Sequence, residues 1–170
     1  MAHLTTQSGR KFDFDRPVFH LPDVAHALSR MIRYNGHQTG TWSVAQHSIA
    51  CSFIVGPSFS REALLHDACE AYLCDVPTPL KMILPGYQAL EHQIESHMRM
   101  QFCLPPEMSG TVKQADRDML IAETQLFHPP LWEEMGRPTG NPLCMKAIQV
   151  IVGRGPQEIC EMFMSRSVGL

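Results

Sequence analysis

Residues 60–81 read SREALLHDACEAYLCDVPTPLK, and the interpretation of the chain starts from this stretch. Its apolar residues follow helical spacing up to Asp75, Ser60 can cap the start, and prolines follow directly after. His66 and Asp67 stand side by side within this apolar pattern. Because burying two ionisable side chains costs free energy unless something binds them, the stretch predicts a helix that carries a site.

The rest of the sequence predicts further helices. Ser43 precedes a helix with Gln46 three residues on, which is a capping-box pattern. No segment shows sustained apolar and polar alternation between hairpin turns, so the expected fold class is all-α. Residues 1–21 are expected to be an irregular or partly extended lead-in, and the proline-rich residues 128–142 a surface loop. Helices are expected over residues 22–33, 43–54, 60–75, 87–102, 109–127, 143–152 and 156–166.

Length and composition predict a single globular domain over residues 1–170. Hydrophobic residues make up 44% and charged residues 18% of the chain, which is a globular balance. The net charge of -3 and the lack of any Lys/Arg run argue against a nucleic-acid polymer as partner. No apolar run is long enough for a membrane span or a signal peptide, so a cytoplasmic protein is expected. Six scattered cysteines without a CxxC pair indicate reduced core residues.

Four metal-binding side chains are expected to converge from separate helices. Glu70 follows Asp67 by three residues and His66 by four, so all three are predicted to share one helical face. His47 comes from the preceding helix and Asp116 from a later one. Two imidazoles and two carboxylates can hold one divalent ion and leave positions open for water and a substrate oxygen.

The same residues carry a family resemblance. Residues 66–81, HDACEAYLCDVPTPLK, resemble the His-Asp-x-x-Glu…Asp-x-Pro-x-Pro-x-Lys motif of HD-domain nucleotide phosphohydrolases. Residues 33–37 (RYNGH) and 42–48 (WSVAQHS) resemble the segment where this family places a phosphate-binding Arg and its first metal His. Residues 113–117 (KQADR) resemble the segment that supplies the last Asp. The resemblance covers most of the chain and implies an HD-domain helical bundle.

The resemblance implies a metal-dependent phosphohydrolase with assigned residue roles. Glu70 and Asp75 would orient or deprotonate the attacking water, Arg33 and Lys81 would bind phosphate oxygens, and Thr78 would add a hydroxyl donor. The implied cofactor is a divalent transition metal (Zn, Mn, Co, Fe or Ni), with an additional Mg left open. The implied metal ligands are His47, His66, Asp67 and Asp116.

Two substrate classes fit the resemblance, and both imply attack at the 5′ α-phosphorus of a deoxynucleotide. One is the deoxynucleoside monophosphate of 5′-deoxynucleotidases. The other is the triphosphate, dATP included, of small phage-type triphosphohydrolases, which the short chain and the RYNGH and WSVAQHS runs favour. Tyr34 and Trp42 could stack on a base against Pro79, or both aromatics could belong to the core. Lys113, on the same helical face as Asp116, is a candidate for binding a longer phosphate chain.

Two other interpretations stay open. The metal could be structural in a non-catalytic nucleotide sensor, or the chain could be a helical scaffold without metal. A homo-oligomer is expected, because the helix at 87–102 and the Met-rich C-terminus carry more apolar surface than one small domain easily buries. The expected partner is a small-molecule deoxynucleotide in the cytoplasm of a bacterium or a phage-infected host, with no membrane involved.

Overall fold

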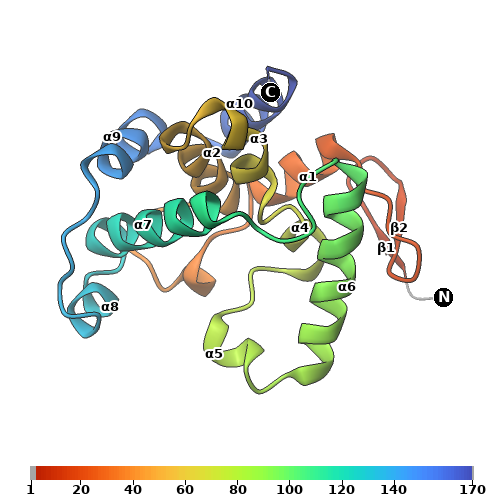
Figure 1. The fold of residues 1–170 in the computed structure, drawn as a ribbon, viewed down its shortest axis with the longest axis horizontal. Helices are drawn as coiled ribbons and strands as arrows, with labels where there is room; N and C mark the ends of the chain where they lie inside the picture. The colour runs from red at the N-terminus through yellow and green to blue at the C-terminus, as the bar shows by residue number, and fades with distance from the viewer. Residues whose placement is uncertain (1–2, 170) are drawn as a thin grey trace.

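The computed structural model describes residues 3–169, and helices make up most of it (Figure 1). The mostly helical class agrees with the sequence expectation. A small antiparallel hairpin, β1 (His3–Thr5) and β2 (Lys11–Asp13), was not predicted, because strands of three residues are too short to show an alternating pattern. The helical elements are α1 (Leu21–Leu28), the 3₁₀ turn η1 (Tyr34–Gly36), α2 (Val44–Ile54), α3 (Pro57–Leu65), α4 (Glu70–Leu73), α5 (Thr78–Lys81), α6 (Pro85–Gln101), α7 (Gly110–Phe127), α8 (Pro129–Glu134), α9 (Pro142–Ile151) and α10 (Pro156–Val168).

Helix α2 is the centre of the packing. It contacts α1, α3, α7, α9 and α10, and its residues 44–52 are all buried. The predicted capping box at its start is confirmed. The Ser43 side chain accepts a hydrogen bond from the Gln46 amide at 3.2 Å, and the Gln46 side chain accepts one from the Ser43 amide at 2.8 Å. This cap fixes where α2 begins and therefore holds His47, in its first turn, inside the core.

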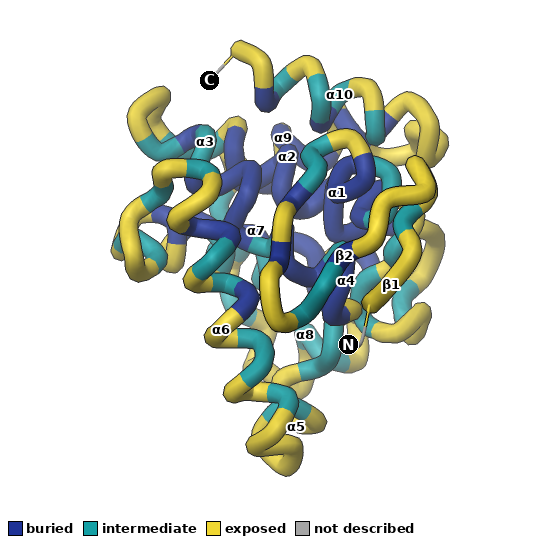
Figure 2. Tube along the Cα trace, turned by 90° about the vertical axis from the view of Figure 1, so that its right-hand side faces the viewer, coloured by how far each residue is buried: buried dark blue, intermediate teal, exposed yellow. Residues whose placement is uncertain are grey.

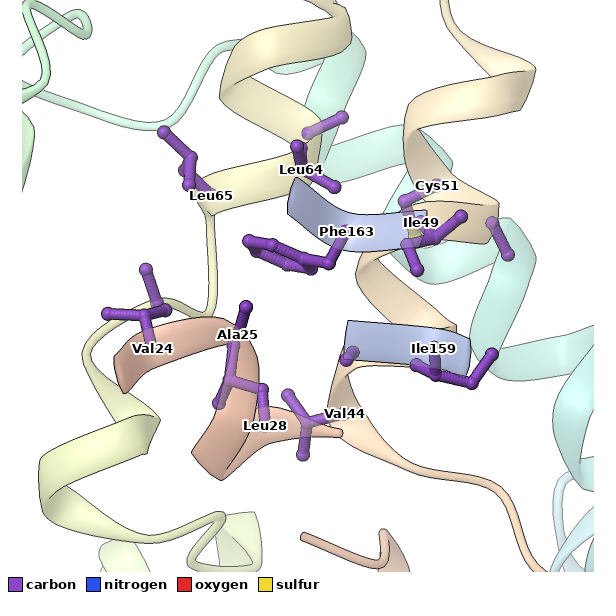
Figure 3. Packing of buried hydrophobic residues seen from close by; sticks show 14 of the residues in the cluster. Val24, Ala25, Leu28, Val44, Ile49, Cys51, Leu64, Leu65, Ile159 and Phe163 are labelled. Carbon is purple, nitrogen blue, oxygen red and sulfur yellow. The ribbon is translucent and has the colours of Figure 1, made fainter. Parts of the chain in front are cut away.

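A continuous apolar core joins the surrounding helices to α2. Figure 3 shows Phe163 of α10 between side chains of α1, α2 and α3, among them Ala25, Ile49 and Leu64. All four are fully buried, and burial of a large apolar side chain is worth about 1.5–3 kcal/mol. Within residues 3–169, no helix combines the length and the apolar character needed to span a bilayer.

Helix α5 and the first turns of α6 project away from this core, at the lower end of the molecule in Figure 1. Figure 2 shows that this arm is mostly exposed. Met82 and Ile83 lie there with 73% of their surfaces exposed. The homo-oligomer expected from the sequence stays a prediction.

The expected continuous helix over residues 60–75 is wrong. Helix α3 begins at Pro57, and the hydroxyl of Ser60 donates to the backbone of Ser52 instead of capping a helix start. Residues 66–69 form tight turns with i→i+3 hydrogen bonds, such as the one from the Glu70 amide to the Asp67 carbonyl at 3.0 Å. His66 and Asp67 therefore lie at the junction of α3 and α4.

Two other expected boundaries are wrong for local backbone reasons. The first helix ends at Leu28 rather than Arg33, because the chain becomes extended and Ile32 pairs with Ser43 in an isolated bridge. Residues 128–142 are not a simple loop but contain α8. The prolines at its start occupy positions where a helix needs no N–H donor, so they begin a helix here rather than prevent one.

Candidate active site

The four predicted metal ligands lie together in the structure. His47 comes from α2, His66 and Asp67 from the α3–α4 junction, and Asp116 from α7. His47 Nε2 lies 3.1 Å from Asp116 Oδ1 and 3.3 Å from His66 Nε2, while His66 Nε2 lies 3.2 Å from Asp67 Oδ2. His47 Nε2 lies 3.7 Å from Asp67 Oδ2, and His66 Nε2 lies 3.9 Å from Asp116 Oδ1. Atoms that share one ion at about 2.0–2.2 Å lie about 3.0–3.6 Å apart, so three of these contacts have the spacing of a common cation and two are slightly longer.

Cys51 is a further donor at this place. Its sulfur lies 3.6 Å from His47 Nε2, and the buried group of His47, Cys51 and His66 can hold a metal ion. Cys51 stands one helical turn after His47 on α2, a spacing that puts both on one face. Burial raises the pKa of the Cys51 thiol, so in the metal-free protein it is an uncharged donor. Sequence reasoning had treated it only as a core residue.

A cavity of about 590 Å³ opens beside these ligands, a volume typical of small-molecule sites. Most of the predicted site residues line it. It also has wall residues that the sequence reasoning did not assign to the site, among them Asn35, His37, Leu120, His128 and Leu131. The predicted residues in its wall are Arg33, Tyr34, Asp67, Glu70, Asp75, Thr78, Pro79, Lys81 and Asp116.

The carboxyl groups of the cavity differ in the direction in which their pKa values are shifted. Burial, followed by the nearby charges of Asp67 and Asp75, raises the pKa of Glu70 well above its ordinary value. Burial also raises the pKa of Asp75, with Asp67 adding to the effect. Burial alone would raise the pKa of Asp67 as well, but the charge of His66 and its hydrogen bond, together with the charges of His47 and Arg33, outweigh burial and lower the pKa. The cavity therefore contains both a strong anion and a carboxyl group suited to holding a proton.

Two cationic side chains face this group of acids. Arg33 Nη1 lies 3.8 Å from Asp67 Oδ2 at the cavity wall. Lys81 forms an ion pair with Glu91 of α6, with 2.6 Å between Nζ and Oε1. Both side chains are mostly buried, which strengthens their interaction with an anion in the cavity.

Two predicted contacts are wrong or unsupported. Trp42 is fully buried and stacks on Phe127, with ring centroids 5.1 Å apart, so it belongs to the core and does not face the cavity. Lys113 is exposed on α7 and is not among the residues that line the cavity. Of the three residues expected to bind the base, Tyr34 and Pro79 line the cavity and Trp42 does not.

Sequence reasoning missed Glu123, the fully buried acid on α7. Its Oε1 lies 2.6 Å from His47 Nδ1 and accepts a hydrogen bond from Trp42 Nε1 at 2.8 Å. Its Oε2 accepts one from the Tyr34 hydroxyl at 3.1 Å and lies 3.1 Å from Arg33 Nε, an ionic contact without good hydrogen-bond alignment. The available signal was its position, two helical turns after Asp116 on the same face.

Comparison with known proteins shows which family the chain belongs to. No protein-family model matches the chain. The uncharacterized protein YfdR of Escherichia coli (strain K12) is 43% identical over 126 residues, which cover 72% of this chain and 71% of YfdR. An uncharacterized protein of Rhodobacter capsulatus is 33% identical over 121 residues, or 64% of this chain and 62% of that protein. The chain belongs to the family of YfdR.

Proposed function

We propose that this chain is a metal-dependent phosphohydrolase of the HD-domain type that cleaves a deoxynucleotide at its 5′ α-phosphorus. The observation that carries the proposal is the convergence of His47, His66, Asp67 and Asp116 beside a cavity, whose wall contains Asp67 and Asp116 together with cationic side chains. A structural metal site needs no adjoining cavity, whereas a hydrolytic site needs room for the ester and for water.

The donor set suits a divalent transition metal. Two imidazole nitrogens and two carboxylate oxygens fit Zn, Mn, Co, Fe or Ni, and an additional Mg on the carboxylates remains open. His47, His66, Asp67 and Asp116 would hold the ion, which when bound neutralises phosphoryl charge and lowers the pKa of water. His66 is already oriented for this task, because its Nδ1 lies 2.8 Å from the Ala63 carbonyl and Nε2 faces the other ligands.

The remaining groups divide into phosphate binding and proton transfer. Arg33 offers two planar N–H donors that match phosphate oxygens, and Lys81 adds a compact charge on the α5 side. Glu70 has a buried Oε2 without a hydrogen-bond partner, and its raised pKa makes the ionised carboxylate a stronger base that can take a proton from an attacking water. Asp75 lines the same wall and is placed to orient that water. Thr78 adds a hydroxyl donor for a phosphate oxygen.

The charge of the cavity favours the monophosphate as substrate. Arg33 and Lys81 are the Lys and Arg side chains among the described residues that line it, against four carboxyl groups. A monophosphate carries about two negative charges and a triphosphate about four, so the longer chain would require more cations than this wall supplies. The triphosphate, dATP included, stays the second candidate, since the RYNGH and WSVAQHS runs resemble the phage-type enzymes.

The test is to incubate the metal-loaded protein with each deoxynucleoside mono- and triphosphate and to identify products by chromatography. Orthophosphate and nucleoside from a monophosphate would support the first candidate, and released triphosphate the second. Asp116→Ala should abolish turnover, as should Asp67→Ala. The matched control is Asp118→Ala, two residues further on α7, which removes only hydrogen bonds to Gln114 and Asn141. If the protein binds a nucleotide but hydrolyses none with any of the metals, the proposal is refuted and the chain is a nucleotide sensor.

A further inference from the structure

We infer that Glu123 is a positioning residue that holds the metal-binding His47 with one carboxylate oxygen and the phosphate-binding Arg33 with the other. The inference rests on the proposed function for the roles of these two side chains. It goes beyond that function, because it assigns the alignment of the metal centre with the phosphate site to a single buried residue of α7. Neither the sequence motif nor the cavity wall includes Glu123.

The hydrogen-bond partners fix the direction of the contact with His47. The indole nitrogen of Trp42 can only donate, so the Glu123 Oε1 that it contacts at 2.8 Å must accept. The same oxygen lies 2.6 Å from His47 Nδ1, so Nδ1 carries the proton. In a neutral imidazole this leaves the lone pair on Nε2, the atom that faces Asp116 and His66. Glu123 thus selects the tautomer of His47 that can bind a metal.

The second oxygen acts on the phosphate side. Tyr34 donates its hydroxyl to Oε2, and Arg33 Nε lies at the same distance of 3.1 Å. The backbone here departs from regular structure, since Tyr34 and Asn35 both have positive φ, at 56° and 51°. The shorter of the two ionic contacts of Arg33 is the one with Glu123, since its contact with Asp67 is 3.8 Å long. Glu123 therefore helps to hold the Arg33 guanidinium in place beside the metal ligands.

The inference predicts effects that loss of a purely structural residue would not produce. Glu123→Gln offers one acceptor oxygen in place of two and removes the charge that faces Arg33. We expect zinc affinity, measured by competition with a chelator, to fall about 10–100-fold, as for other residues that orient metal-binding imidazoles. We also expect the KM for the nucleotide to rise. Tyr34→Phe is the matched variant, because it removes a donor to Oε2 alone and should leave zinc affinity unchanged.

A direct readout does not depend on any variant folding. Ring ¹⁵N shifts of His47 in the metal-free wild-type protein report which ring nitrogens carry a proton, and we expect one on Nδ1. A neutral ring with its only proton on Nε2 would overturn the inference, as would unchanged zinc affinity in Glu123→Gln. Both measurements need no substrate, so they stand even if no nucleotide is hydrolysed. Conversely, turnover with an unchanged zinc affinity in Glu123→Gln would leave the proposed function intact and refute the role of Glu123.

Discussion

A buried ion pair between Glu62 and Arg99 ties together the helices that place the candidate site. The side chains are 5% and 2% exposed, and Arg99 Nη1 lies 3.3 Å from Glu62 Oε1. The same Glu62 oxygen accepts the amide of Ser109, the residue that caps α7, at 2.8 Å. The pair therefore joins α3 and α6 to the start of the helix that carries Asp116.

Replacing Arg99 with Met leaves Glu62 as an unpaired buried acid, and it also removes the hydrogen bonds that Arg99 donates to Glu95 at 2.9 Å and to the Pro105 carbonyl at 3.0 Å. Glu62 would keep the Ser109 amide but lose its counter-charge, and breaking a buried pair costs about 3–5 kcal/mol. Because both side chains are almost fully buried, solvent screening reduces this figure little. For a chain of this length the melting temperature should fall by about 6–20 °C.

The double variant Arg99→Met/Glu62→Gln tests the reason for that loss. It removes both charges and keeps an acceptor for the Ser109 amide, so the part of the loss that comes from the unpaired Glu62 should return, while the part from the Glu95 and Pro105 contacts should not. Urea denaturation of the metal-free proteins, followed by circular dichroism, measures Arg99→Met, Glu62→Gln and the double variant. A loss below about 1 kcal/mol in Arg99→Met, or a double variant as unstable as Arg99→Met, would refute the reasoning.

Three further predictions concern the hairpin and the metal centre. Burial alone would raise the pKa of Asp23, but hydrogen bonds from Ser8, Thr6 and His20 outweigh it and lower the pKa below 3.8. Asp23→Asn should therefore cost about 1–3 kcal/mol at neutral pH. This deficit should shrink as the pH falls below 3.8, and a pH-independent difference in urea midpoints would contradict it. If the carboxylates complete the metal site, Cys51→Ala should keep zinc affinity within about threefold, whereas a tenfold loss would mean that the thiolate is a ligand. Zinc at about 100 times its Kd should stabilise the protein by about 2.7 kcal/mol, and a chelator should reverse the shift in melting temperature.

Capping residues and proline positions predicted where helices begin, because these features depend on residues that are neighbours in the sequence. The Ser43 cap and the proline at the first position of α10 depend on neighbouring residues, and both helices begin within a residue or two of their expected positions. The break at residues 66–69 was not predictable in this way. Apolar positions three and four residues apart fit an α-helix and a run of tight turns equally well, and the choice depends on packing against other helices.

For the site as well, residues marked by local sequence signals were predicted, and residues placed there by tertiary packing were not. Spacing and motif gave His47, His66, Asp67 and Asp116, which lie together in the structure. Glu123 was missed because its environment comes from residues about 80 positions earlier, including the buried Trp42. For the same reason the sequence left Trp42 open between a base-stacking role and the core, since its sequence distance from Arg33 gives no information about which way its ring points.

The composition of the core gives a physical reason to connect this cluster with a ligand. His47 and Glu123 are fully buried and His66 is 4% exposed, so three ionisable side chains lie inside the protein. Replacing buried charged groups with well-packed apolar residues is often neutral or stabilising, so stability of the metal-free fold does not require them. An ion that binds these groups would offset their desolvation, and its binding energy would add to folding. The same groups then connect stability to the proposed chemistry. Variants that weaken metal binding should have a lower melting temperature in the presence of zinc and a lower turnover than the wild type. The melting temperature of the same variants without metal should change much less.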